Sequence, residues 1–320
     1  MLPSALRVRA KQQGHAAPQV ENETMSLRIA IIGKTGQLAR ALLAEGEELG
    51  HEIIALGRDA LDLTASPANI ETAIIGLPSG LDALILAAAY TNVDGAETDS
   101  STAYAVNATA PAVIARICAQ HDIPLIHIST DYVFDGENDV PYMPDDDTDP
   151  LGVYGASKLD GELAVLESGA RALILRTTWL YDGSGKNFLT TMLRLAESRD
   201  VISVVDDQIG RPTYTGHLAQ AILKAADVFS QEPDMPTALH HVTNGGEPIS
   251  WAGFAKAIFK STNKDVKVDN IPSSDYPTPA ERPAFSVLDT DSFERTFRHP
   301  LPDWQAGLRA ALEAAEDDAA

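Results

Sequence analysis

Short apolar segments alternate with longer amphipathic segments along the first half of the chain. Apolar runs near residues 27–32, 52–56, 82–87 and 124–130 predict strands, and the segments near residues 36–49, 67–76 and 104–121 predict helices. Strands that are apolar on both sides are typical of a parallel sheet covered by helices on both faces. The pattern therefore predicts an α/β fold built on a Rossmann-like, doubly wound parallel sheet.

The regular alternation loosens after about residue 185. Helices are predicted near residues 186–199, 215–229 and 250–262, with a short strand at "ALHHV" and a proline-rich loop, "IPSSDYPTPAERP". We expect a sheet domain over residues 25–185 and a smaller C-terminal lobe over residues 186–320, interleaved with the main sheet, that covers a ligand crevice. Residues 1–24 lack apolar periodicity and predict a disordered tail without the apolar core of a signal peptide.

The amino-acid composition disfavours some classes of binding partner. The chain has 46 acidic and 24 basic residues, a net charge of −22, which disfavours nonspecific binding to nucleic acid or to an anionic membrane. A single cysteine, Cys118, suits a reducing cytoplasm. The eight histidines form no pair spaced i, i+4, so we expect no zinc site. The acidic loop at residues 145–149 is either a cation site or a solvated loop.

A glycine turn follows the first predicted strand in "IAIIGKTGQLARALL". Gly33 and Gly36 allow a tight turn and close backbone approach to a pyrophosphate, and Ala39 still permits close helix packing. The helix that follows supplies unpaired N–H groups and a partial positive charge at its N-terminus. We expect the dinucleotide to contact Gly33, Thr35, Gly36, Gln37 and Leu38.

The ends of the next two strands carry further candidates. Arg58 stands where an NAD enzyme typically has an acidic residue, so it is either a clamp for a 2′-phosphate, which favours NADPH over NADH, or a solvated arginine. Asp62 and Leu63 would hydrogen-bond and cover the adenine, and Ala87, Ala88 and Ala89 are small enough for the cofactor to pass.

A tyrosine stands four positions before a lysine in "VYGASKLDGE". Tyr154 and Lys158 would share one helix face, and a nearby ammonium lowers the pKa of a phenol from its usual value of about 10. The fourth strand ends in Ser129-Thr130, and strand C-termini are where ligands bind in such sheets. These residues together predict a proton donor for a hydride-transfer reaction.

Several motifs occur in an order that marks a family. After the glycine turn come "AAAYTNVDGAE", "STDYVFDG", "YGASK", "RTTWLYDGSGKNF", "DDQIGRPTYT" and "YPTPAERPAFSVLDT". In these motifs the chain resembles the extended short-chain dehydrogenases/reductases, and within them the branch that reduces dTDP-4-dehydrorhamnose. The resemblance implies hydride transfer from NADPH or NADH to C4 of that nucleotide sugar, in the last step of dTDP-L-rhamnose biosynthesis.

The resemblance also implies roles for individual residues. Tyr154 would protonate the C4 oxygen, Thr130 would hydrogen-bond that oxygen, and Lys158 would hold the nicotinamide ribose. The sugar contacts would be Val93, Asp131 and Trp179, the last of which could equally be core packing. Arg282 is a candidate diphosphate clamp, because a guanidinium offers planar, paired N–H donors. The alternative for Arg282 is a surface ion pair.

One departure from the family concerns assembly. Some members form a magnesium-linked dimer through a glutamate near the start of the first helix, where this chain has Arg40 and Ala41. We therefore expect a monomer or weak dimer and no metal. Two other interpretations remain open: another nucleotide-sugar oxidoreductase or epimerase, and a non-catalytic NADP-binding regulatory subunit similar to that of methionine adenosyltransferase.

Overall fold

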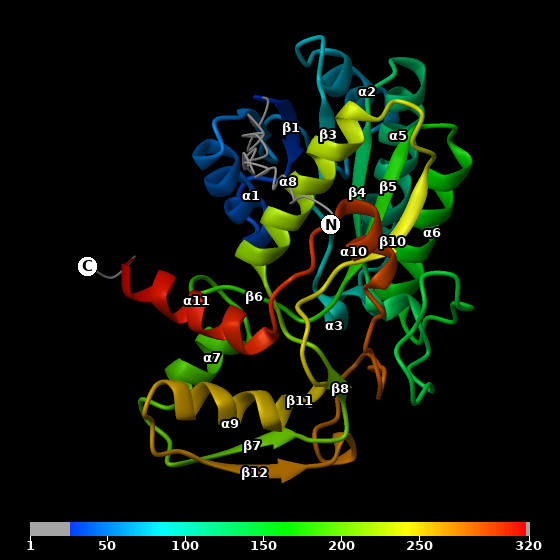
Figure 1. Cartoon of the computed structure of the whole chain (residues 1–320). Coiled ribbons are helices and arrows are strands. Elements are labelled where there is room, and N and C mark those ends of the chain that lie inside the picture. Colours follow the sequence, from blue (N-terminus) through cyan, green and yellow to red (C-terminus); the bar gives the residue numbers. More distant parts are fainter. Residues whose placement is uncertain (1–25, 318–320) are drawn as a thin grey trace, which may run out of the picture.

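A six-stranded parallel sheet forms the centre of the larger part of the molecule in the computed structural model, which describes residues 26–317 (Figure 1). The predicted tail at residues 1–24 lies outside the described residues. The sheet strands are β1 (Arg28–Ile32), β2 (Glu52–Leu56), β3 (Ala83–Leu86), β4 (Leu125–Thr130), β5 (Ala172–Thr177) and β10 (Ala238–His241). Most of their residues are apolar and buried on both sides, as the continuous apolar runs predict.

Helices cover both faces of this sheet, which confirms the doubly wound α/β fold. One face carries α1 (Gln37–Glu48), α8 (Thr215–Gln231) and α10 (Asp291–Phe297). The other carries α2 (Pro67–Ile75), α5 (Ala110–Gln120) and α6 (Val153–Glu167). Two separate apolar cores result, one on each side of the sheet.

The strand order places a crevice at the carboxyl end of β1. The order is β2-β1-β3-β4-β5-β10, so β1 lies between β2 and β3. Helix α1 connects β1 to β2 over one face, and α2 returns to β3 over the other face. The chain connections leave β1 and β3 in opposite directions, and ligands of such sheets bind at this switch point.

The predicted helix over residues 104–121 forms, as part of a continuous helical stretch over residues 100–120 that consists of three consecutive segments. These are α4 (Ser100–Tyr104), the π-helical segment η1 (Ala105–Thr109) and α5. The Asn107 side chain accepts a hydrogen bond from Tyr90 N at 2.8 Å and donates to Ser157 Oγ at 3.0 Å. These contacts with β3's end and with α6 stabilise the widened turn, a feature often found at functional sites.

A smaller lobe lies below the sheet in the view of Figure 1. Strands β7 (Val201–Val205) and β12 (Lys267–Ile271) pair in parallel and pack with α7 (Phe188–Leu195) and α9 (Trp251–Ser261). Alternate residues of β7 are buried, because only one side of this pair is covered. The lobe has its own apolar core, to which α11 (Trp304–Asp317) contributes Trp304 and Leu308.

Short elements join the two parts. Strand β6 (Leu180–Tyr181) pairs with β9 (Thr213–Tyr214), and β8 (Ile209–Gly210) pairs with β11 (Ile249–Ser250). The remaining short helices are α3 (Val93–Ala96), η2 (Asp131–Val133) and η3 (Ser273–Asp275). Because α8 and β10 return to the main sheet, the chain passes between sheet and lobe more than once.

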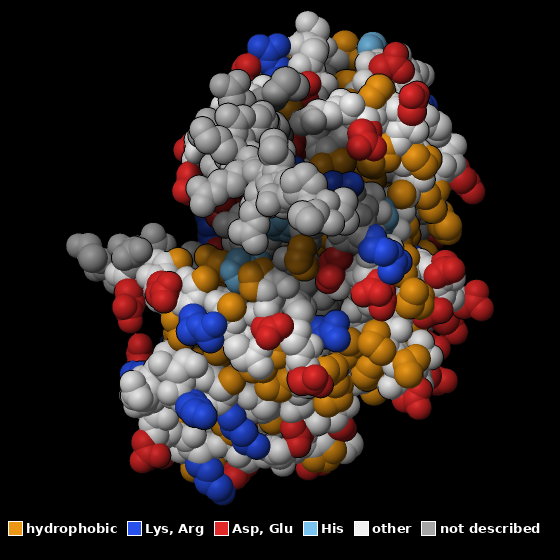
Figure 2. Space-filling view, viewed as in Figure 1, with side chains coloured by type: hydrophobic (Ala, Val, Ile, Leu, Met, Phe, Trp, Pro, Cys, Tyr) orange, Lys and Arg blue, Asp and Glu red, His pale blue; other side chains and the backbone are white. Residues whose placement is uncertain are grey.

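The surface agrees with the acidic composition. Figure 2 shows acidic side chains scattered over the visible face, with Lys and Arg side chains among them over the smaller lobe. Among residues 26–317, no helix combines the length and the apolar content needed to cross a bilayer.

Candidate active site

Helix α6 brings the tyrosine and the lysine to the carboxyl end of β4. Tyr154 is 9% exposed and Lys158 is 2% exposed. The Lys158 ammonium donates to the Ile128 carbonyl oxygen at 2.6 Å and lies 3.5 Å from His127 Nε2. The helix begins where Val153 N donates to Glu97 Oε1 at 2.8 Å, so α3's end fixes the first turn of α6.

Thr130 and Asp131 lie beside the Tyr154 phenol. The Thr130 hydroxyl donates to Asp131 Oδ1 at 3.0 Å, and the Thr178 hydroxyl donates to Asp131 Oδ2 at 2.6 Å. Asp131 is 2% exposed, and its burial raises its pKa to about 6, although hydrogen bonds from Thr178, Ser286 and Thr130 oppose the increase. The carboxylate thus holds hydroxyl groups from three separate segments of the chain.

The expected lowering of the Tyr154 pKa is wrong for this arrangement. Burial raises the pKa of Tyr154 to about 12, and a hydrogen bond between the Thr130 hydroxyl and the phenol only partly offsets it. Burial also lowers the pKa of Lys158 to about 8, against the opposing effect of Glu162. Desolvation outweighs charge here because the Lys158 ammonium is directed to the Ile128 carbonyl. The phenol therefore stays protonated at neutral pH.

The glycine turn has the shape of a phosphate cradle. Gly33 has φ +119°, and a Cβ there would lie 3.3 Å from Ala88 N, so the position requires glycine. A Cβ on Gly36 would meet nothing within 4 Å, and no side chain caps the N-terminus of α1 that follows. Thr35 is exposed, whereas Gln37 and Leu38 belong to the first turn of α1. Open space in front of free N–H groups fits a dinucleotide pyrophosphate.

Basic side chains lie at the carboxyl end of β2. Arg58 is 79% exposed and its Nε is 3.3 Å from Asp62 Oδ2. Asp62 also accepts hydrogen bonds from Thr64, which lower its pKa together with Arg58. Lys34 lies against the same turn, since a Cβ on Gly57 would be 3.6 Å from Lys34 Cδ. The two cations could both face a 2′-phosphate.

The remaining predicted cofactor contacts flank this crevice. Ala87, Ala88 and Ala89 are partly exposed at the end of β3, and Leu63 is buried in the core cluster that includes Leu56 and Leu61. The alanines therefore line the switch point. Leu63 packs beneath the loop that follows β2, in the core cluster with Leu56 and Leu61.

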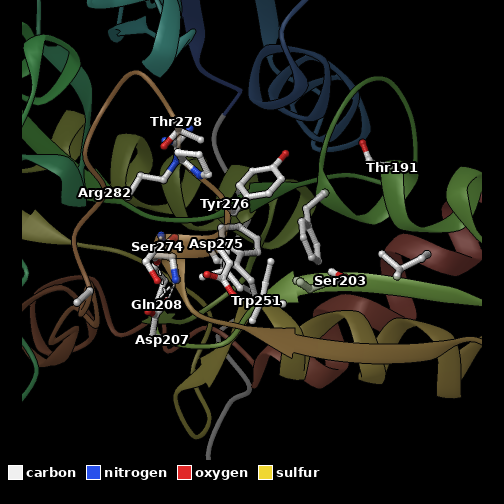
Figure 3. A pocket seen from close by; sticks show the side chains of 18 of the residues that line it. Thr191, Ser203, Asp207, Gln208, Trp251, Ser274, Asp275, Tyr276, Thr278 and Arg282 are labelled. Carbon is white, nitrogen blue, oxygen red and sulfur yellow. Dashed lines mark hydrogen bonds between the residues drawn. The ribbon is translucent and has the colours of Figure 1, made fainter.

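A cavity of about 1240 Å³ lies between the sheet domain and the smaller lobe. Its wall includes Tyr132 and Arg282 at the sheet side, and Phe188 and Trp251 from α7 and α9. The Tyr132 ring packs edge-on against Tyr154, with the ring centroids 5.4 Å apart. Figure 3 shows Trp251 and Tyr276 close together, with Arg282 beside Thr278. The cavity thus adjoins the buried phenol.

Of the five predicted substrate contacts, Arg282 lines this cavity and the other four are not among its lining residues. Val93 begins α3 and packs in the cluster that contains Tyr154. Arg282 lines the cavity, and its Nη2 lies 2.9 Å from Asp94 Oδ2, an interaction that lowers the Asp94 pKa. Trp179 follows β5 and stacks on Trp251. Arg282 therefore forms the ion pair that was the alternative interpretation, although it also lines the cavity where a diphosphate clamp was expected.

Metal-ligand side chains are not gathered into a site in the part of the chain that the structure describes, where no group of three or more His, Cys, Asp or Glu residues could hold an ion. Arg40, at the position of the family's glutamate, instead donates to Asp182 Oδ2 at 3.2 Å and Ser184 Oγ at 3.1 Å. The first helix is thereby tied to the loop that leads into α7.

Comparison with known proteins places this site in a family. The model described as RmlD substrate binding domain matches residues 27–316. The dTDP-4-dehydrorhamnose reductase of Sinorhizobium fredii is 41% identical over 294 residues, which cover 90% of this chain and 97% of that protein. The chain belongs to the dTDP-4-dehydrorhamnose reductase family. The reductase of Escherichia coli K12 is 38% identical, with coverage of 89% of this chain and 97% of that protein.

A solved structure of the reductase family shares the fold. The dTDP-4-dehydrorhamnose reductase of Bacillus anthracis, in complex with NADP, superposes with a TM-score of 0.84 at 34% identity and covers 91% of this chain and all of that one. The predicted family and the predicted fold are confirmed.

Three residues of the site escaped the sequence analysis. Lys34 lies inside the glycine turn, and a lysine within that motif is a signal that the sequence offered. Tyr132 follows directly after the "STD" residues, so its place next to Tyr154 could have been considered. Trp251 offered no local signal, because its partner Trp179 lies more than 70 positions away in the sequence.

Proposed function

We propose that this protein reduces the C4 keto group of dTDP-4-dehydro-β-L-rhamnose to give dTDP-L-rhamnose, with NADPH favoured over NADH. The main support for this proposal is the buried cluster of Thr130, Tyr154 and Lys158 at the end of β4. Tyr132 packs against Tyr154 and lines the large cavity, so the cluster adjoins that cavity. The names of the relatives supply the nucleotide sugar. A cavity of about 1240 Å³ is ample for it.

The chemistry follows from the protonation state of the site. A reduced nicotinamide supplies the hydride. As C4 gains that hydride, the carbonyl π pair moves onto the oxygen, and Tyr154 transfers its phenolic proton there. The pKa of about 12 keeps this phenol protonated at neutral pH, as a donor must be. Lys158 would hold the nicotinamide ribose, and Thr130 would hydrogen-bond the C4 oxygen.

The remaining assignments extend the same proposal. Residues 25–185 would bind the cofactor, through the glycine turn and the ends of β2 and β3, and residues 186–320 would mainly bind substrate. The substrate contacts would be Val93, Thr130, Asp131, Trp179 and Arg282. Because Arg282 already pairs with Asp94, a diphosphate would have to share or replace that carboxylate. The protein would act in the cytoplasm as a monomer or weak dimer.

A direct assay tests the proposed reaction. Purified protein is mixed with dTDP-4-dehydrorhamnose and either NADPH or NADH, and loss of reduced-nicotinamide absorbance is followed while the product is identified by mass spectrometry. A nucleotide sugar without a 4-keto group, dTDP-glucose, serves as the control and should leave the absorbance unchanged. NADPH binding without turnover would instead support the regulatory-subunit interpretation, and an isomer of the added sugar formed without net consumption of NADPH would support the epimerase.

A further inference from the structure

Trp179 has an unusual backbone conformation for a large aromatic residue. Its φ is +48°, in the left-handed region that side chains with a Cβ rarely adopt. Such a conformation is strained and persists only where the surroundings hold it. The neighbours of Trp179 therefore indicate what the conformation serves.

Backbone and side-chain contacts hold Trp179 from the sheet side. The preceding residue, Thr178, donates its hydroxyl to buried Asp131 at 2.6 Å. The Trp179 carbonyl oxygen accepts a hydrogen bond from Thr213 N at 3.1 Å. A Cβ on Gly210 would lie 2.6 Å from Trp179 Cε2, so only glycine lets the indole lie where it does.

A second tryptophan holds the indole from the lobe side. The rings of Trp179 and Trp251 are stacked with centroids 3.5 Å apart and an interplanar angle of 8°. Trp251 is the first residue of α9, where Ser250 caps the helix by accepting from Gly253 N at 3.0 Å. Phe188 of α7 also contacts the Trp251 ring, at 4.6 Å between centroids. Trp251 thus belongs to one helix of the smaller lobe, α9, and packs against another, α7.

We propose that Trp251 is a positioning residue that fixes the Trp179 indole for contact with the sugar of the bound nucleotide sugar. The inference rests on the proposed function for the nature of that ligand. Stacking covers a face of each indole, so Trp251 orders Trp179 and couples the smaller lobe to the strained end of β5. Binding of the sugar, and not of the nucleotide, therefore depends on Trp251.

The test compares two ligands that differ by the sugar. Trp251→Phe, Trp251→Leu and the control Trp304→Phe are prepared; Trp304 is the third tryptophan of the chain and lies in the core of the same lobe. The dissociation constants of dTDP-L-rhamnose and dTDP are measured by calorimetry. We expect the affinity for dTDP-L-rhamnose to fall about 3- to 30-fold in Trp251→Leu and less in Trp251→Phe, with dTDP affinity unchanged.

Circular dichroism provides a readout that needs no ligand. The near-ultraviolet signal of Trp179, measured as the difference between each variant and the same variant with Trp179→Leu added, should fall in Trp251→Leu and persist in Trp304→Phe. If Trp251→Leu fails to fold, Trp251→Phe carries the comparison. Equal losses of affinity for both ligands, or no loss for either, would overturn the proposal.

Failure of the proposed function looks different. A wild-type protein that binds neither dTDP nor dTDP-L-rhamnose would remove the nucleotide sugar as substrate. The near-ultraviolet signal of Trp179 would then decide alone whether Trp251 orders Trp179, and a Trp179 signal that survives unchanged in Trp251→Leu would refute the positioning role.

Discussion

Tyr154 combines a buried phenol with a raised pKa at the edge of the cavity. We predict that Tyr154→Phe lowers turnover by about 10²- to 10⁴-fold, the usual contribution of a positioned general acid, while NADPH binding and the melting temperature stay close to wild type. Steady-state assays with calorimetric titration of NADPH check this. Tyr181→Phe, a buried tyrosine of the smaller lobe, is the control, and near wild-type turnover in Tyr154→Phe would exclude the phenol as the donor.

Lys158 sets a pH limit on the same site. Burial lowers its pKa to about 8, so the ammonium is fully present below that value and is lost as pH rises through it. We predict that kcat/KM for reduction falls above about pH 8. The Tyr154 phenol, with a pKa of about 12, loses its proton only at much higher pH. A profile that stays flat between about pH 7 and 10 would contradict the role of the ammonium.

Arg58 determines the preference between cofactors in our proposal. A charge-assisted hydrogen bond to phosphate stabilises binding by about 1.5–3 kcal/mol, so Arg58→Ala should weaken NADPH binding roughly 10- to 100-fold and leave NADH unaffected. Fluorescence titration with both cofactors measures this. Arg28→Ala is the matched control, because Arg28 is also exposed and paired, with Glu52, at the opposite end of the sheet. Equal losses for both cofactors would point to a structural role, and no loss would assign the phosphate to Lys34.

At the scale of elements, close packing of α6 sets the position of its polar side chains. A Cβ on Gly161 would lie 2.1 Å from the Asn107 carbonyl oxygen, and one on Gly155 would lie 2.0 Å from the Tyr132 carbonyl oxygen. Both neighbours are backbone atoms, which cannot rotate away. The helix therefore approaches the π-helical turn and η2 only because these positions are glycine, and this approach keeps Tyr154 and Lys158 against β4.

A single methyl group tests this packing. Alanine normally stabilises a helix relative to glycine, yet we predict that Gly161→Ala lowers the free energy of unfolding by about 1–3 kcal/mol through overpacking. Gly46→Ala in α1 is the control, since its Cβ would meet Ile53 Cδ1 at 2.7 Å and Cγ1 at 2.9 Å, which are side-chain atoms that can rotate and not backbone atoms. Urea denaturation measures both variants. A more stable Gly161→Ala protein would show that α6 can move away from Asn107 at little cost.

At the scale of the whole molecule, buried histidines make the fold sensitive to acid. Burial lowers the pKa of His241 to about 3, and burial with the Lys158 charge holds that of His127 well below its usual value. Below pH 6.5 the unfolded chain binds protons that these two folded-state imidazoles do not, so stability present above pH 6.5 is lost as pH falls. Asp131, whose pKa is raised, acts in the opposite direction below about pH 6.

The size of this effect is measurable. Each fully buried imidazole should lower the free energy of unfolding by ~1.4 kcal/mol per pH unit between about pH 6 and 5. Urea denaturation at several pH values gives the slope. His241→Gln should reduce the slope, whereas the control His121→Gln, at the exposed end of α5, should not. A stability that is constant between pH 7 and 5 would contradict the prediction.

The sequence by itself determined the elements and the local site chemistry. Continuous apolar runs and amphipathic segments depend only on neighbouring residues, so the hydrophobic pattern alone locates strands such as β1 and helices such as α1. The glycine turn and the pairing of Tyr154 with Lys158 are local too, since i and i+4 always share a helix face. Their places at strand ends followed from the rules for parallel sheets.

Tertiary structure decided what depends on distant neighbours. The π-helical turn at Asn107 forms because side chains from α6 and the end of β3 meet there. Burial reversed the expected pKa shift of Tyr154, since desolvation is a property of the packed molecule and not of a four-residue spacing. The stack of Trp251 on Trp179 joins residues of α9 and the end of β5, and only the folded chain brings those two faces within 3.5 Å.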